Sequence, residues 1–140
     1  MSETQKQAMT IAKECFAVRL RKLNRVVSAI YEDSFRPFGL TIAQFNLLIA
    51  IGARGQASPT QLVHSLSLEK STVSRNIEKM KKKGWVSLVS ATDKRSHLLT
   101  LTPSGDAILE IATPAWTFAQ EKAAKTLGPL SSIIGDISLS

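Results

Sequence analysis

The stretch at residues 70–84, KSTVSRNIEKMKKKG, decides the fold of this chain. Its apolar residues Val73, Ile77 and Met80 recur at the spacing of one helical face, and Gly84 supplies the residue that commonly ends a helix. The opposite face gathers hydroxyl and cationic side chains. From this face and its edges we assign to a binding surface Ser71, Thr72, Ser74, Arg75, Lys79 and Lys82. The stretch therefore predicts a helix with one buried face and one face suited to a polyanion.

Two helix starts precede this stretch. The segment TIAQ at 41–44 has the form of a capping box, in which Thr41 and Gln44 cap each other's backbone amides. A shorter helix is predicted over residues 58–66, with Ser58 as N-cap and Pro59 in its first turn. The inward side chains expected in these helices are Phe45, Leu48, Ile49, Ile51, Leu62, Val63 and Leu66. Because only residues 67–69 separate the second helix from the next, the pair predicts a helix-turn-helix.

After residue 84 the apolar period changes from 3.6 to 2. Residues 85–89 and 97–101 predict two strands, and residues 90–96 predict the loop of their hairpin. A hairpin directly after a helix-turn-helix is the wing of a winged helix. We expect Asp93, Lys94 and Arg95 at its tip, where an arginine can enter the DNA minor groove. The alternative for such a loop in isolation is an ordinary solvated turn.

The ends of the chain predict further helices. Residues 9–35 contain no Pro or Gly and are apolar over about half a helical circumference, which suits one helix packed on two sides. Its second side would meet a partner subunit, or, as the alternative, the interior of a monomer. Thr102 and Pro103 open a later helix, in which Pro114 predicts a kink or a division into two segments. The last eleven residues predict a short amphipathic helix that needs a docking surface.

These elements define a fold class that is mainly α with a small β-hairpin wing. The 140 residues are the size of one domain. Within it we expect a winged helix-turn-helix at 41–102 and dimerisation helices at 1–36 and 103–140.

The charge is uneven along the chain. The net charge is +7, of which residues 69–97 contribute +5, whereas residues 98–140 carry −2. This concentration on the predicted helix and wing favours double-stranded DNA as the partner over a membrane face. No apolar run approaches the roughly 20 residues of a membrane span, so we expect a cytoplasmic protein with no membrane partner.

Other chemistries find little support in the sequence. The single Cys15 cannot form an internal disulfide, and His64 and His97 are too few for a structural zinc site. The carboxylates are scattered, and no nucleophile has an evident base. We therefore expect no metal, no cofactor, no catalytic residue and no enzymatic activity.

The predicted recognition helix suggests roles for its residues. Arg75 is the best candidate for bidentate reading of a guanine edge, a contact that contributes about 1–3 kcal/mol of discrimination. The lysines at 79, 81, 82 and 83 suit phosphates, which set register and affinity but carry little sequence information. We expect Arg75→Ala to relax sequence preference, and Arg95→Ala to weaken binding without disturbing the dimer.

The series of motifs resembles the MarR-type winged-helix transcriptional regulators. The residues that carry the resemblance are GLTIAQFNLL at 39–48, residues 62–83 with STVSR at 71–75, KGWV at 83–86, DKRS at 93–96 and LTLTPSG at 99–105. The resemblance implies an obligate homodimer that binds a pseudo-palindromic operator with half-sites roughly 34–36 Å apart. It also implies a repressor that a small aromatic or phenolic effector releases from DNA.

Three residues depart from the family pattern. Val63 stands where a small alanine is common, and Ser67 stands where the turn usually has glycine, which predicts a remodelled turn. Glu69 stands where an aspartate often caps the recognition helix, and its longer side chain is expected to cap less well.

The signal remains open between alternatives. The resemblance offers a peroxide-sensing branch that would use Cys15, although a lone cysteine is more commonly a small buried hydrophobe. Trp116 and Phe118 can line an effector pocket, but aromatic residues at helical spacing are more commonly core, so no effector residue is assigned. A further alternative is a non-specific architectural winged-helix protein, which would bind all duplexes alike.

Overall fold

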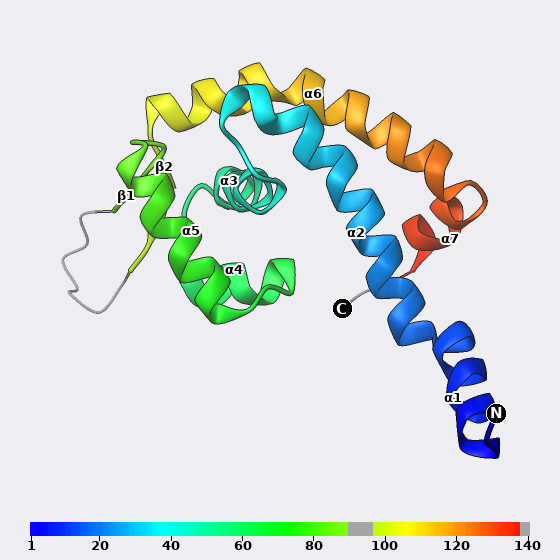
Figure 1. Ribbon diagram of the computed structural model, residues 1–140. Helices are drawn as coiled ribbons and strands as arrows, with labels where there is room; N and C mark the ends of the chain where they lie inside the picture. The colour runs from blue at the N-terminus through cyan, green and yellow to red at the C-terminus, as the bar shows by residue number, and fades with distance from the viewer. Residues whose placement is uncertain (90–96, 138–140) are drawn as a thin grey trace.

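The structure, a computed structural model, describes residues 1–89 and 97–137 (Figure 1). Its elements in chain order are α1 (Glu3–Glu14), α2 (Phe16–Phe35), the 3-10 turn η1 (Arg36–Phe38), α3 (Ile42–Arg54), α4 (Pro59–Leu66), α5 (Lys70–Lys82), β1 (Val86–Leu88), β2 (Leu99–Leu101), α6 (Pro103–Leu127) and α7 (Leu130–Asp136). The mainly helical fold with a small hairpin is confirmed.

Helices α3, α4 and α5 pack around one core. Both predicted capping boxes are present, one closing on Thr41 and Gln44 and the other on Ser58 and Gln61. In α3 the prediction for one position was wrong, because Ile49 is 45% exposed whereas Leu47 is fully buried. The reason is that α3 lies at the centre of the region and packs against α2, α4, α5, α6 and β2, which bury more than a single face (Figure 1).

The hairpin is shorter than predicted but has the expected antiparallel order. Val86 lies opposite Leu101, and Leu99 also pairs with Ala57 in the connection between α3 and α4. Gly105, at the start of α6, packs against the chain before β1. A Cβ atom there would lie 2.1 Å from the carbonyl oxygen of Trp85, so the approach of α6 to the hairpin requires glycine.

The first helix differs from its prediction. The helix begins at Glu3, with Ser2 as N-cap, and it is interrupted at Cys15, whose ψ of 113° is not helical. No Pro or Gly marks this break. The guanidinium group of Arg19 donates to the carbonyl oxygen of Lys13 across it, at 3.2 Å, and so bridges α1 and α2.

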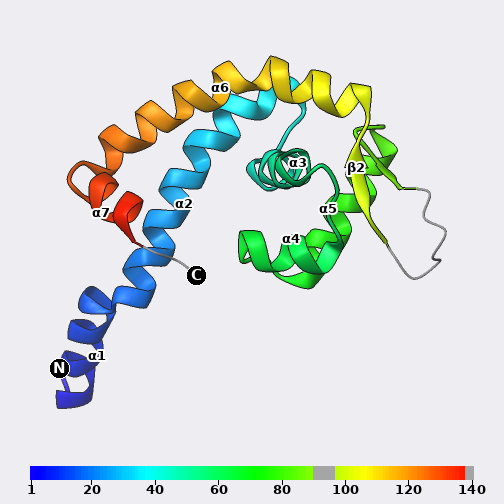
Figure 2. The ribbon, with the colours of Figure 1, turned by 180° about the vertical axis from the view of Figure 1, so that it is seen from behind.

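Helix α6 arches over the molecule from the hairpin to α7 and crosses α2 on the way (Figures 1 and 2). It runs through Pro114 as one continuous helix, so the alternative of two segments is wrong. As the other alternative implied, the helix is not a straight rod but bows along its course (Figures 1 and 2). Near Pro114 the hydroxyl of Ser34 donates to the carbonyl oxygen of Ala115 at 2.7 Å, which ties α2 to α6. No single described helix is long and apolar enough to cross a membrane.

Candidate nucleic-acid interface

Helix α5 presents the predicted polar face to solvent. Its inner face is held by Val73, Ile77 and Met80, which are at most 5% exposed. The six predicted contact residues of this helix lie on the outside, five of them exposed and Thr72 half-buried. The confirmed burial pattern therefore leaves hydroxyl groups at the start of the helix and cationic groups further along it.

The N-terminus of α5 has no side-chain cap. Glu69 occupies the N-cap position, and its carboxylate accepts no hydrogen bond from the first turn, as its length predicts. The turn before it keeps the glycine-like geometry in spite of the serine. Ser67 has φ 51° and ψ 40°, a left-handed conformation that glycine adopts without strain.

The four lysines of this region are not equivalent. Lys81 forms an ion pair with Glu78 at 3.3 Å. Lys83 lies 4.5 Å from the centre of the Trp85 ring and donates to the carbonyl oxygen of Gly39. Within the described part of the chain, Lys79 and Lys82 have no ion pair, and they are the lysines best placed to contact phosphates. The hydrogen bond from Lys83 to Gly39 joins residues 44 positions apart, and no local sequence pattern indicates it.

The hairpin stands beside α5 and is anchored to the domain. The backbone of Leu99 exchanges two hydrogen bonds with that of Ala57, of 3.0 and 2.8 Å, and the hydroxyl of Thr100 donates to the carbonyl oxygen of Gly55. The loop residues Asp93, Lys94 and Arg95 lie outside the described residues.

A pocket of about 480 Å³ lies between the terminal helices and the winged-helix region. Its walls come from α2, α3, α6 and the end of α4 with the following turn. The side chains that line it include Asn24, Tyr31, Ala43, Asn46, Trp116 and Gln120. Trp116 is thus at a pocket and Phe118 is 64% exposed, so neither is the core residue that the spacing favours.

Two further predictions concern reactive groups. Cys15 is a half-buried free thiol at the junction of α1 and α2, within a helix break rather than on a continuous stripe. Among residues 1–89 and 97–137, no three His, Cys, Asp or Glu side chains gather in a way that could hold a metal ion.

Comparison with known sequences finds similarity to one family. The family model described as MarR family matches residues 38–96. The multiple antibiotic resistance protein MarR of Salmonella typhimurium is 32% identical over 89 residues, and that of Escherichia coli is 30% identical over 92 residues. These matches cover 63% and 65% of this chain but only 62% and 64% of the relatives, so less than two thirds of each relative is spanned.

Solved structures extend the similarity to most of the fold. A cysteine-to-serine mutant of Escherichia coli MarR, complexed with operator DNA, has a TM-score of 0.76 at 25% identity and covers 88% of this chain and 91% of its own. Bordetella bronchiseptica BpsR, whose DNA binding is regulated by 6-hydroxynicotinic acid, has a TM-score of 0.75 at 27% identity, with coverages of 87% and 89%.

Proposed function

We propose that this chain, which is similar to the MarR family in sequence, is a transcriptional regulator that binds double-stranded DNA as a homodimer and is released by a small aromatic effector. Helix α5 would enter the major groove, Arg75 would contact a guanine edge, and Ser71, Thr72 and Ser74 would let the backbone approach. Arg95, with Asp93 and Lys94, would reach the minor groove from the wing.

The observation that carries the DNA proposal is the exposed face of α5. Five of the six residues of α5 that we assign to DNA contact are exposed, and the opposite face of the helix is buried in the core. A rigid helix with hydroxyl and cationic groups on the outside fits a groove lined by phosphates. Residues 69–97 also hold +5 of the net charge of +7.

The DNA proposal is tested by gel-shift titration of Arg75→Ala and Lys79→Ala against the best palindrome selected from a random duplex library. Arg75→Ala should lose about 1–3 kcal/mol of discrimination between that site and its variant at the contacted base pair. Lys79→Ala should weaken binding equally for all duplexes and lower the salt slope by about 1.

Lys81→Ala is the matched control, because its ammonium group is paired with Glu78 on the same helix. It should change the salt slope less than Lys79→Ala does. If the wild type selected no palindrome and bound all duplexes alike, the protein would be the architectural alternative. If Arg75→Ala left discrimination unchanged, α5 would not read the bases.

The homodimer proposal rests on apolar surface at the ends of the chain. Phe16 is 80% exposed, and Ile133 and Leu130 on α7 are 55% and 44% exposed. Neither α1 nor α7 contains a buried residue. Residues 1–40 carry a net charge of +3 and residues 98–140 a net charge of −2, so the N-terminal helices of one copy complement the C-terminal helices of the other.

The effector proposal rests on the 480 Å³ pocket. The pocket has the size and mixed lining of a small-molecule site, with Trp116 for stacking and Asn46 for hydrogen bonding. It touches both the terminal helices and the turn that leads into α5. A ligand there would alter the position of α5 relative to α2 and α6, and so the spacing of the two recognition helices. Addition of phenol should quench Trp116 fluorescence and release the selected palindrome.

A further inference from the structure

Residues 83–85, at the C-terminal end of α5, form a fixed corner of the chain. The backbone amide of Gly84 donates to the carbonyl oxygen of Lys81 at 2.9 Å. The amide of Trp85 donates to the carbonyl oxygen of Met80 at 3.0 Å, so the two bonds close the helix in a Schellman motif. Gly84 supplies the positive φ of 76° that this motif requires, and Trp85 is buried. The chain therefore leaves α5 in one defined direction.

Lys83 ties this corner to the connection between α2 and α3. Its side-chain ammonium group donates to the carbonyl oxygen of Gly39 and lies 4.5 Å from the centre of the Trp85 ring. The far side of the same connection is held by α2, because the carboxylate of Glu32 accepts from the backbone amide of Ile42 at 2.9 Å. These contacts run in series from α2, through the connection, to the end of α5.

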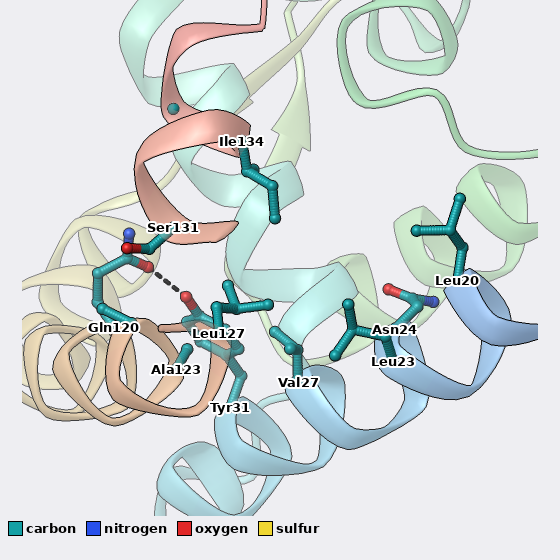
Figure 3. Close-up of a pocket in the computed structure, with 12 residues that line it drawn as sticks. Leu20, Leu23, Asn24, Val27, Tyr31, Gln120, Ala123, Leu127, Ser131 and Ile134 are labelled. Carbon is teal, nitrogen blue, oxygen red and sulfur yellow. Dashed lines mark hydrogen bonds between the residues drawn. The ribbon is translucent and has the colours of Figure 1, made fainter. Parts of the chain in front are cut away.

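A second contact ties the corner to α6. The hydroxyl of Thr102 donates to the carbonyl oxygen of Gly84 and accepts from the amide of Gly105, so it joins the end of α5 to the first turn of α6. Helices α2 and α6 are joined to each other in turn, since the hydroxyl of Tyr31 donates to the side-chain oxygen of Gln120 (Figure 3). Both contacts at the corner therefore lead to the same crossed pair of terminal helices.

The polar contacts at the corner define an orientation that apolar packing alone does not. The winged-helix region also meets the terminal helices through buried side chains such as Phe35 and Ala112. Hydrophobic attraction is non-directional, whereas a hydrogen bond weakens steeply when its angle changes. Arg75 precedes Lys83 by eight residues, or about 12 Å along the helix, so a small tilt at the corner displaces the base-reading end of α5.

We propose that Lys83 is a positioning residue that sets the half-site spacing recognised by the homodimer, and that it does not contact phosphate. This inference rests on the proposed function and assigns the source of its spacing specificity. The ammonium group is already engaged by Gly39 and Trp85, and a phosphate would have to replace both contacts. Without this tie the two winged-helix regions of a dimer would turn more freely against the terminal helices, and half-sites at another spacing would bind with a smaller penalty.

Binding of Lys83→Met to DNA, measured by fluorescence anisotropy over a range of salt concentrations, tests the proposal. Methionine keeps an unbranched apolar stem, but it carries no charge and cannot donate a hydrogen bond. Because Lys83 is exposed, the variant should fold. The probes are the palindrome selected by the wild type and two derivatives whose half-sites lie one base pair closer or farther apart. One base pair changes the separation by about 3.4 Å and turns one half-site by about 35°.

The wild type should bind the selected spacing at least roughly tenfold more tightly than either derivative. In Lys83→Met this preference should fall by about threefold or more, because one tie between the winged-helix region and the terminal helices is lost. The slope of log affinity against log salt concentration should change by less than about 0.3, since no phosphate contact is removed.

Lys82→Met is the matched control, because Lys82 is exposed and has no ion pair within the described part of the chain. It should lower the salt slope by about 1 and weaken binding equally at all three spacings. If Lys83→Met behaved in the same way, Lys83 would be a phosphate contact and the proposal would be overturned. An equal loss at all spacings with an unchanged slope would also overturn it, because Lys83 would then contribute to stability alone.

The outcome for the proposed function is separate. A wild type that prefers one spacing, with a preference that Lys83→Met retains in full, would contradict the positioning role and leave palindrome recognition by a homodimer intact. A wild type that binds all three probes alike would contradict palindrome recognition, and the positioning role with it.

Discussion

The winged-helix region, residues 41–102, and the terminal helices differ in how many large apolar side chains they expose to solvent. Of fifteen large hydrophobic side chains exposed in the described parts of the chain, only Ile49 and Leu88 belong to the winged-helix region. The other thirteen lie in residues 1–36 and 103–137. The winged-helix region thus buries its apolar residues in a core that it shares with Phe35 of α2 and Ala112 of α6. The terminal helices also display apolar surface, which the proposed homodimer would cover.

The largest expected effect is a loss of stability in the winged-helix region. Leu48 is fully buried among α3 and its neighbours. Leu48→Ala should lower the free energy of unfolding by about 2–5 kcal/mol, because it removes buried methyl groups and leaves a cavity. Urea unfolding followed by circular dichroism measures this change. The loss should be the same at low and high protein concentration, since the side chain belongs to the core of one copy.

Ile49→Ala is the control in the adjacent position, where the side chain is 45% exposed. Its effect should stay below about 1 kcal/mol. Equal losses for the two variants would mean that α3 does not bury the face seen in the structure.

The winged-helix region could be predicted because its signals are local. Two capping boxes mark the starts of α3 and α4, and the 3.6-residue period of Val73, Ile77 and Met80 marks the buried side of α5. The break at Cys15 could not be predicted, because neither Pro nor Gly marks it. The burial of Leu47 was missed because a one-face pattern does not describe a helix enclosed on several sides.

In the candidate site, too, the features set by local sequence could be predicted and the long-range contacts could not. The outward placement of Ser71, Arg75 and Lys79 follows from helical periodicity alone. The engagement of Lys83 with Gly39, and the contact of Tyr31 with Gln120, join residues 44 and 89 positions apart. Such contacts depend on how helices cross, which hydrophobic periodicity does not encode.

The next effect should appear in assembly and not in folding. Phe16 is 80% exposed at the start of α2. Phe16→Glu should raise the dimer dissociation constant at least 100-fold, or about 2.7 kcal/mol, because a carboxylate would have to be desolvated in an apolar interface. Sedimentation velocity over a range of concentrations measures this constant. The circular dichroism spectrum of the variant should remain that of a folded helical protein.

Ile49→Glu is the matched control, since it places the same charge at an exposed isoleucine outside the terminal helices. It should leave the dissociation constant within a few-fold of the wild type. A dimer that tolerated Phe16→Glu but not Ile49→Glu would move the interface onto the winged-helix region and reverse the contrast between the two regions.

The smallest effect is expected at the turn between α4 and α5. Among the described residues, Ser67 is the only residue other than glycine with a positive φ, at 51°. A left-handed conformation costs such a residue about 1–2 kcal/mol, and glycine avoids this cost. The greater freedom of glycine in the unfolded chain offsets about 0.5–1 kcal/mol of the gain. Ser67→Gly should therefore raise the free energy of unfolding by about 0.5–1 kcal/mol in urea titrations.

Ser67→Ala separates conformational strain from loss of the hydroxyl group, because alanine retains the Cβ atom that disfavours a positive φ. It should give no stabilisation, and neither variant should alter the dimer dissociation constant, since the turn lies outside the terminal helices. Equal stabilisation by glycine and alanine would show that the hydroxyl group, and not the backbone, limits stability at this turn. A shift in the dimer constant would instead couple the turn to the terminal helices, through the 480 Å³ pocket that both of them line.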